Sequence, residues 1–194
     1  QEYPLERNVV DRRMYNLDKK KVIAAKAFKL IKNNETIFLD VSTTNIELAR
    51  LIASSGMHVV VVSNMIDILQ ILATNTAITA IGTGGTMYRT VNGFMGVAAI
   101  DVIKQYSFDR AFMGSCGVDM TDCTVTTLGV EDGLTKKSVL QSSRHKYVVM
   151  EKDKFYFNDS YKYAYFDDIS GIVTDEFPDD TIVSTLERAG VKLF

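Results

Sequence analysis

The stretch TIFLDVSTTN at residues 36–45 decides the fold that we predict for this chain. Its first half is an almost continuous apolar run of strand length, and its second half is a row of small polar residues. Apolar side chains then recur at helical spacing over residues 46–52. A buried strand, a polar turn and a helix form the repeating unit of an α/β protein with a parallel sheet.

The same pattern recurs on both sides of this stretch. Residues 59–64, VVVVSN, again place a buried strand before a polar turn and a helix. Further strands are predicted at residues 77–81, 108–113, 146–150, 161–166, 169–174 and 191–194. Further helices are predicted from residue 19 to a stop at Asn33-Asn34, over 134–143 and over 181–189, with a Gly-, Thr- and Asp-rich loop at 115–133. The order predicts an α/β fold with a doubly wound, mostly parallel sheet.

One domain accounts for most of the chain. Residues 19–194 contain no internal repeat, low-complexity stretch or linker, so we predict a single α/β domain there. Residues 1–18 are polar and charged, with the pair Arg12-Arg13 and no clear period. We predict that they form a linker or arm left where a preceding module was removed.

Composition excludes several classes of function. The net charge is −2, and no basic stripe is visible, so these residues are not expected to contact nucleic acid themselves. Cys116 and Cys123 fit neither a zinc site nor a disulfide framework, and we expect two thiols in a reducing cytoplasm. The apolar run over residues 59–62 is too short to span a membrane, and no signal peptide opens the chain. We expect a soluble cytoplasmic protein with no membrane partner.

Three polar loops at strand ends are candidates for binding a ligand, because ligands bind at the carboxyl ends of parallel strands. In the first, Ser42, Thr43 and Thr44 open a helix whose N–H groups favour an anion such as phosphate, although Ser and Thr are also ordinary helix caps. In the second, Asn64 is suited either to capping its own helix or to binding a ligand hydroxyl. The third, GTGGT at residues 82–86, lets the backbone approach a ligand but matches no nucleotide-binding motif.

Charged candidates lie in the second half of the chain. Asp132, Lys136 and Lys154 lie in or beside the loops of this half, and a lysine is suited to pairing with a phosphate, although most charged loop residues are simply solvated. The two histidines, His58 and His145, are far apart and form no Ser-His-Asp or Cys-His arrangement. We therefore expect no catalytic residues, no metal and no cofactor.

These features resemble one family of bacterial regulators along essentially the whole chain. The ordered motifs are Arg12, Lys20-x-x-Ile23-Ala24, Leu39-Asp40-x-Ser42-Thr43-Thr44, Val62-Ser63-Asn64, Gly84-Gly85, Phe112-x-Gly114-x-x-Gly117-x-Asp119, Thr135-Lys136, Lys154-Phe155 and Val173-Thr174-Asp175. This set resembles the C-terminal effector domain of the DeoR family of repressors. The resemblance implies a fold similar to ribose-5-phosphate isomerase and the CoA transferases. It also implies a phosphorylated sugar as effector, and operator DNA contacted only through a missing N-terminal helix-turn-helix.

The resemblance also assigns residues to the ligand. It implies that the phosphate is held by Asp40, Ser42, Thr43, Thr44, Asn64, Gly84 and Gly85. It places Asp132, Lys136 and Lys154 around the sugar. Many relatives have Asp at the position of Glu151 and Gly at that of Tyr156, so the departures concentrate on the sugar side.

Two other classes of function are weighed against a non-enzymatic sensor. A sugar-phosphate isomerase or deaminase would share the phosphate loop but needs a carboxylate positioned as a base, for which Glu131 and Asp132 are the candidates. A pure interaction domain would leave the three hydroxyl residues at 42–44 unexplained. Because repressors act on two-fold operators, the resemblance also implies a homodimer or homotetramer.

Overall fold

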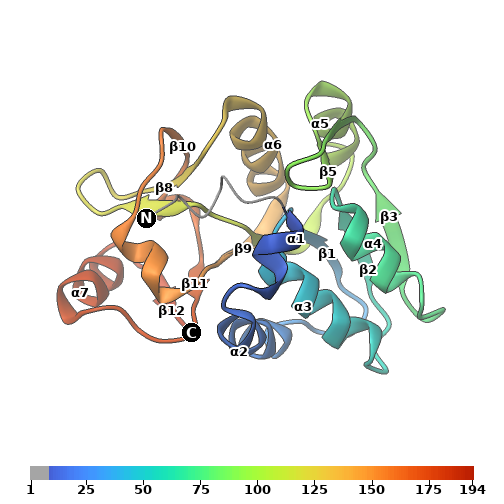
Figure 1. Cartoon of the computed structure of the whole chain (residues 1–194), viewed down its shortest axis with the longest axis horizontal. Helices are drawn as coiled ribbons and strands as arrows, with labels where there is room; N and C mark the ends of the chain where they lie inside the picture. The colour runs from blue at the N-terminus through green and yellow to red at the C-terminus, as the bar shows by residue number, and fades with distance from the viewer. Residues whose placement is uncertain (1–8) are drawn as a thin grey trace.

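The computed structural model describes residues 9–194 (Figure 1). The first part of the predicted arm, residues 1–8, lies outside the described residues. The rest of it is helical: α1 spans Val9–Met14, and α2 spans Leu17–Phe28. Val9 is buried in the core, so these residues belong to the domain. A helix of six residues is too short to show a helical period, so α1 could not be predicted from periodicity.

A parallel sheet of seven strands forms the centre of the molecule. Its strands are β1 (Thr36–Leu39), β2 (Val60–Ser63), β3 (Thr79–Gly82), β6 (Phe108–Met113), β9 (Ser143–Val149), β11 (Gly171–Val173) and β12 (Lys192–Leu193). They lie in the order β12-β11-β9-β6-β1-β2-β3, and all neighbouring pairs are parallel. The predicted mostly parallel α/β fold is confirmed.

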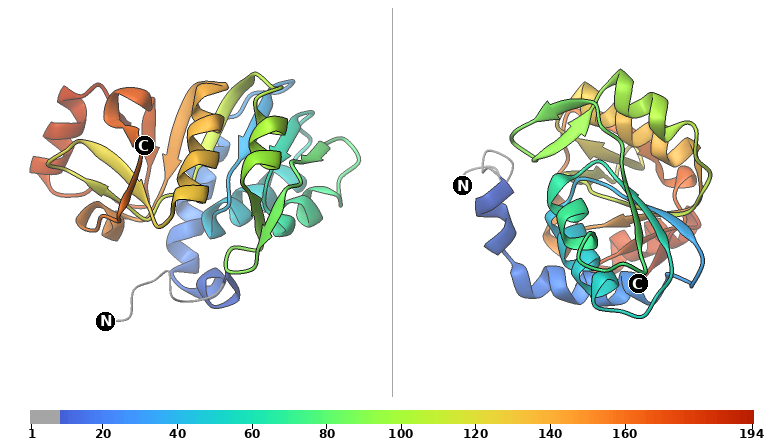
Figure 2. Two further views of the ribbon diagram at one scale, coloured as in Figure 1. Left: turned by 90° about the horizontal axis from the view of Figure 1, so that it is seen from above. Right: turned by 90° about the vertical axis from the view of Figure 1, so that its right-hand side faces the viewer.

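Helices cover both faces of this sheet, as Figure 2 shows. The remaining helices are α3 (Thr43–Ala53), α4 (Ile66–Leu72), α5 (Val97–Ile103), α6 (Val130–Gln141) and α7 (Asp180–Arg188). Alternate strand residues point to opposite faces, so Ile37 and Leu39 pack with α2, α3 and α4. Phe38, between them, belongs to the core cluster on the other face, which also contains residues of α5, α6 and α7. The inner strands β1 and β2 are largely apolar because both of their faces are buried.

Two small antiparallel units complete the fold. The hairpin of β4 (Thr86–Tyr88) and β5 (Gly93–Met95) lies beside α5. A three-stranded sheet joins β7 (Gly117–Asp119), β8 (Thr124–Thr127) and β10 (Tyr161–Tyr165). We predicted a loop over residues 115–133, which was wrong because β7, β8 and the start of α6 lie there. The four residues of β8 are all buried, and β-branched Thr and Val fit a buried strand, whereas a count of polar residues favours a loop.

Two predicted helix boundaries were also wrong. The first long helix ends at Phe28, and Asn34 takes its left-handed conformation (φ 66°) in the turn before β1 instead of capping the helix. Helix α6 begins at Val130, ahead of the predicted start at residue 134, although Gly133 disfavours a helix. Glycine is required there because a Cβ would lie 2.1 Å from the ring of Tyr161. Two short 3-10 helices, Lys152–Tyr156 and Phe166–Asp168, flank β10.

Candidate functional site

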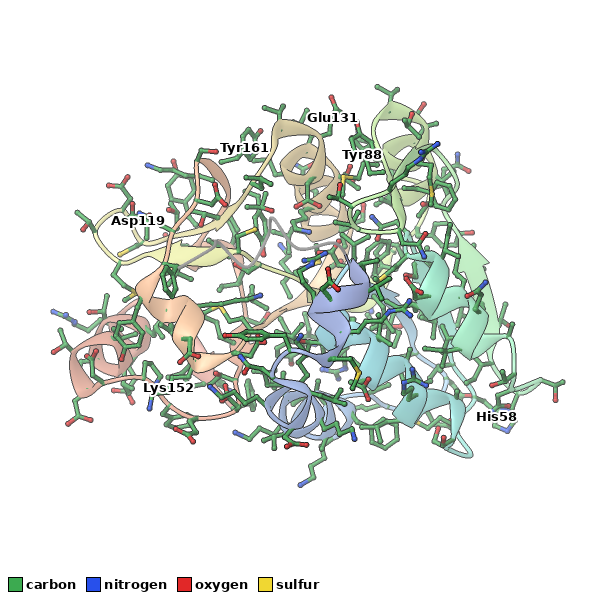
Figure 3. All side chains as sticks on the ribbon, in the orientation of Figure 1. His58, Tyr88, Asp119, Glu131, Lys152 and Tyr161 are labelled. Carbon is green, nitrogen blue, oxygen red and sulfur yellow. The ribbon has the colours of Figure 1, made fainter. Side chains whose placement is uncertain are left out.

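A cavity of about 330 Å³ opens where β1 and β6 end. Its walls come from α1, the β4–β5 hairpin, the start of α6 and the 3-10 helix that follows β9. Figure 3 labels two residues of this wall, Tyr88 from the hairpin and Glu131 from α6, whereas His58 lies at the opposite end of the molecule. The polar side chains that line the cavity are Arg12, Ser42, Tyr88, Thr90, Ser115, Cys116, Thr127, Glu131, Asp132, Lys136 and Lys154.

Lys136 is the centre of a buried charged network at the base of the cavity. Its Nζ lies 2.6 Å from Asp40 Oδ2 and 3.0 Å from Asp132 Oδ1. The N–H of Gly114 donates to the same Asp40 oxygen at 2.9 Å, and the Thr127 hydroxyl donates to Asp132 Oδ2 at 2.5 Å. Both Asp40 and Lys136 are almost completely buried, so the pair fixes the end of β1 to α6.

Burial and pairing shift the acidities of this network. Burial raises the pKa of Asp40 to about 6, although Lys136 acts in the opposite direction. Burial on its own lowers the pKa of Lys136, but the carboxylates of Asp132 and Asp40 outweigh it and leave that pKa above its ordinary value. Lys136 therefore stays positively charged at neutral pH, where Asp40 is mostly ionised.

A second cationic group enters from the opposite wall. Lys154 Nζ donates to the Ser115 carbonyl at 2.8 Å and lies 3.6 Å from Glu151 Oε2. The other oxygen of Glu151 lies 4.0 Å from Nζ of Lys20, which is buried and donates to the carbonyls of Arg12 and Tyr15. Burial lowers the pKa of Lys20 to about 8. These contacts connect the cavity to the C-terminal end of α1.

Arg12 lies at the cavity, although the sequence analysis placed it in a linker or arm and assigned it no contact with the ligand. It lines the cavity from α1, and its Nε is buried without a hydrogen-bond partner among the described residues. Burial lowers the pKa of Arg12, although nearby acidic groups act in the opposite direction. A buried guanidinium N–H without a partner is costly and suits an anionic ligand. In the sequence Arg12 was the first motif of the family resemblance and one half of a charged pair, in a segment that we took for an arm.

The predicted phosphate loop lies only partly at the cavity. Ser42 lines it, and its Oγ accepts hydrogen bonds from the N–H groups of Thr44 (3.2 Å) and Asn45 (3.4 Å). Ser42 thus acts as the cap of α3, the ordinary reading of this motif. Thr43 and Thr44 are not part of the cavity lining, and Thr44 is buried. The side chain of Asn45 donates to the carbonyls of Asp40 and Phe112 and so ties β1 to β6.

The other predicted phosphate ligands lie away from the lining. Asn64 donates to the Phe94 carbonyl at 2.9 Å and does not cap α4, which begins after Met65. Gly84 (φ 61°) and Gly85 (φ 117°) form the turn between β3 and β4. The structure therefore brings Ser42 together with the three predicted sugar residues, Asp132, Lys136 and Lys154. The role of each as a ligand-binding residue stays a prediction.

Other expected properties can be placed on the structure. Cys116 and Cys123 are free thiols, and burial raises the pKa of Cys116, which lines the cavity. Among residues 9–194, no group of three or more His, Cys, Asp or Glu side chains is arranged to hold a metal ion. Within the same range, every helix is too short or too polar to cross a membrane.

Known proteins resemble the chain in sequence. Residues 15–176 match the family described as the DeoR C terminal sensor domain. The chain is 25% identical over 176 residues to the HTH-type transcriptional repressor GlcR of Bacillus subtilis, covering 91% of this chain and 67% of that protein. It is 25% identical over 183 residues to the glycerol-3-phosphate regulon repressor of Escherichia coli, with 94% and 72% covered. It is 30% identical over 154 residues to the lactose phosphotransferase system repressor of Lactococcus lactis, with 78% and 59% covered.

Solved structures share the fold at low sequence identity. Ribose 5-phosphate isomerase A of Methanocaldococcus jannaschii superposes with a TM-score of 0.52 at 20% identity, over 72% of this chain and 54% of that one. The delta subunit of eIF2B from Chaetomium thermophilum superposes with a TM-score of 0.60 at 12% identity, over 87% and 59%. Similarity at this level concerns the fold alone. The family match covers most of the chain, so the chain belongs to the family of DeoR C-terminal sensor domains.

Proposed function

We propose that this chain is the ligand-sensing domain of a transcriptional repressor and that its cavity binds a phosphorylated sugar without turning it over. The family match supports the sensing role, and the curated relatives are transcriptional repressors. The name of one relative refers to glycerol 3-phosphate, and that of another to the lactose phosphotransferase system. The volume of about 330 Å³ suits a small ligand.

The unpartnered Nε of Arg12 is the observation that carries this proposal. It is a buried cationic donor of a side chain that lines the cavity together with Lys136 and Lys154. Both lysines have carboxylate partners within the protein, whereas Arg12 Nε has no hydrogen-bond acceptor among the described residues. A phosphate would supply that acceptor, and Ser42 is the member of the predicted phosphate loop that lines the same cavity.

The sugar would occupy the remainder of the cavity. Its hydroxyls would form hydrogen bonds with Asp132 and Lys154, while Lys136 holds Asp132 in position. Tyr88 and Met95 of the hairpin would cover the apolar face of the ring. In this proposal Asp40 acts through Lys136, and Thr43, Thr44, Asn64, Gly84 and Gly85 shape the loops around the phosphate.

The output of the sensor would be a change in operator binding through a separate helix-turn-helix module, in a homodimer or homotetramer. Ligand binding controls such a switch only if the two states bind the ligand with different affinity. No cofactor takes part in the proposed function.

A thermal-shift panel tests the proposal directly. Glycerol 3-phosphate, fructose 1-phosphate, fructose 1,6-bisphosphate and tagatose 6-phosphate are compared with glycerol, fructose and tagatose. We expect at least one phosphorylated compound to raise the melting temperature, its free sugar to have no effect, and the compound to be recovered unchanged. Arg12→Gln should abolish the shift, whereas Arg144→Gln, an exposed arginine on β9, should leave it intact. Equal stabilisation by free sugars, or turnover of the phosphate, would refute the proposal.

A further inference from the structure

Strand β3 is a free edge of the central sheet. It pairs with β2 alone and lies at the right-hand border of the molecule in Figure 1. The N–H of Thr79 donates to the Val59 carbonyl at 3.1 Å, and the N–H of Thr83 donates to the Ser63 carbonyl of β2 at 3.2 Å. Backbone groups alternate along a strand, so Ala80 and Gly82 direct their N–H and C=O groups away from the sheet. Within the described residues these groups have no hydrogen-bond partner.

This edge has none of the usual protections against pairing with another strand. Monomeric proteins protect edge strands with charged residues, proline, bulges or very short length. Residues 68–88 contain no Asp, Glu, Lys, Arg or Pro, in a chain that is 24% charged. The side chains of Thr79 and Ala80 are exposed, and Ile81 is half-buried. By contrast, the opposite edge β12 is two residues long and carries Lys192.

The absence of charge indicates which partner fits. In a two-fold symmetric interface each residue near the axis meets its own copy, so any charged residue there would face a like charge. Two copies of a segment without charged residues can pack against each other without this repulsion. A different protein would impose no such restriction, because its surface could supply opposite charges.

We propose that β3 pairs antiparallel with β3 of a second copy of this chain, across a two-fold axis at Ile81. Ala80 would then form a hydrogen-bonded pair with Gly82 of the partner subunit, and Gly82 with Ala80 of the partner subunit, each pair exchanging both of its N–H···O bonds. Ile81 would face Ile81 of the partner subunit in a non-hydrogen-bonded pair, with Cα atoms about 4.5 Å apart. The two sheets become one continuous sheet.

The neighbouring surface extends this contact. A stable interface buries about 1,200–2,000 Å² in total, which is more than four paired residues supply. Gln70, Ala73 and Thr74, in and just after α4, are exposed and uncharged and flank β3 in the same segment. The interface does not involve the ligand cavity, so this proposal stands whether or not the cavity binds a sugar phosphate.

Sedimentation equilibrium over a range of concentrations tests the pairing. Ala80→Pro removes an outward N–H while keeping the ladder to β2, because edge strands tolerate proline on their free side. Ala80→Lys places two like charges close to the axis. Each change acts twice in the dimer, so we expect the dimer dissociation constant to rise by about tenfold or more. Ala98→Lys, the same change at an exposed position on α5, should leave it unchanged.

A cross-link tests the register. In a background with Cys116 and Cys123 replaced by Ser, Ile81→Cys should form an intersubunit disulfide with a mild oxidant, because a Cα separation of about 4.5 Å lies within the range of disulfides. Thr79→Cys, displaced from the axis, should remain reduced. A wild-type chain that stays monomeric at all concentrations would overturn the proposal and would leave a different protein as the candidate partner of β3. A dimer that persists unchanged in both Ala80 variants would overturn it as well.

Discussion

Replacing Lys136 by Met should destabilise the domain strongly. The change removes the Nζ that lies 2.6 Å from Asp40 Oδ2 and leaves a buried carboxylate whose remaining hydrogen bond comes from the Gly114 N–H. Removing one partner of a buried ion pair costs about 3–5 kcal/mol. In a domain of this size each kcal/mol lowers the melting temperature by about 2–4 °C, so the expected loss is about 6–20 °C.

The cost of Lys136→Met should depend on pH. Asp40 has a pKa of about 6 in the folded protein against an ordinary value of 3.8, and the loss of Lys136 raises the folded-state value further. The folded state then binds a proton more tightly than the unfolded state, so the stability from this group is present at low pH and is lost as pH rises through the folded-state pKa. The variant should therefore be less impaired at about pH 5 than at about pH 8.

Urea denaturation followed by circular dichroism at both pH values measures this effect. The matched control is Lys137→Met, the neighbouring lysine, whose Nζ lies 3.4 Å from the Tyr161 hydroxyl, with an expected change within about 0.5 kcal/mol. The double variant Asp40→Asn/Lys136→Met should recover part of the loss, because it removes the unpaired charge. Equal costs for Lys136→Met and Lys137→Met, or a cost that does not change with pH, would refute this account of the pair.

Three further predictions follow from particular contacts. Gly117→Ala should destabilise the fold by more than about 3 kcal/mol in urea denaturation, because the new Cβ would lie 1.9 Å from the Phe157 carbonyl oxygen; a change below about 1 kcal/mol would contradict this packing. Phe112→Ala, in the fully buried centre of β6, should cost about 3–5 kcal/mol by the same measurement, and a smaller cost would mean that the site collapses around the missing ring. Arg12→Gln should weaken binding of a stabilising sugar phosphate by about tenfold or more in calorimetry, and unchanged affinity would exclude Arg12 from the ligand contacts.

The sequence predicted the centre of the main sheet well because the inner strands β1 and β2 are buried on both faces. A continuous apolar run such as residues 59–62, followed by a polar turn, indicates a buried strand, and β2 spans Val60–Ser63. In the small antiparallel sheet β10 was predicted, whereas β7 and β8 were not, because their residues are mostly polar or small by type, although β8 is fully buried. Helix α1 was not predicted because it is shorter than two turns and buries Val9 alone among its six residues, which leaves no periodic pattern.

The candidate site was predicted in part for similar reasons. Asp132 and Lys136 are one helical turn apart on α6, so their common position at the cavity could be read from spacing. The hydroxyl residues at 42–44 were ambiguous, because a helix cap and an anion site use the same residue types. Arg12 and Lys154 line the same cavity although most of the chain separates them, and a proximity of that kind is visible only once the fold is known.

The attachment of α1 has a thermodynamic consequence. Arg12 reaches the cavity from this helix, while Arg13 pairs with Asp67 and Lys20 binds the carbonyls at its C-terminal end. A ligand that pairs with Arg12 adds one more attachment for α1. A partner that binds α1 and displaces it must therefore weaken the binding of that ligand. By linkage, the ligand weakens the binding of that partner by the same factor. Ligand binding in the cavity and the position of α1 are then coupled, so a change in either one shifts the other.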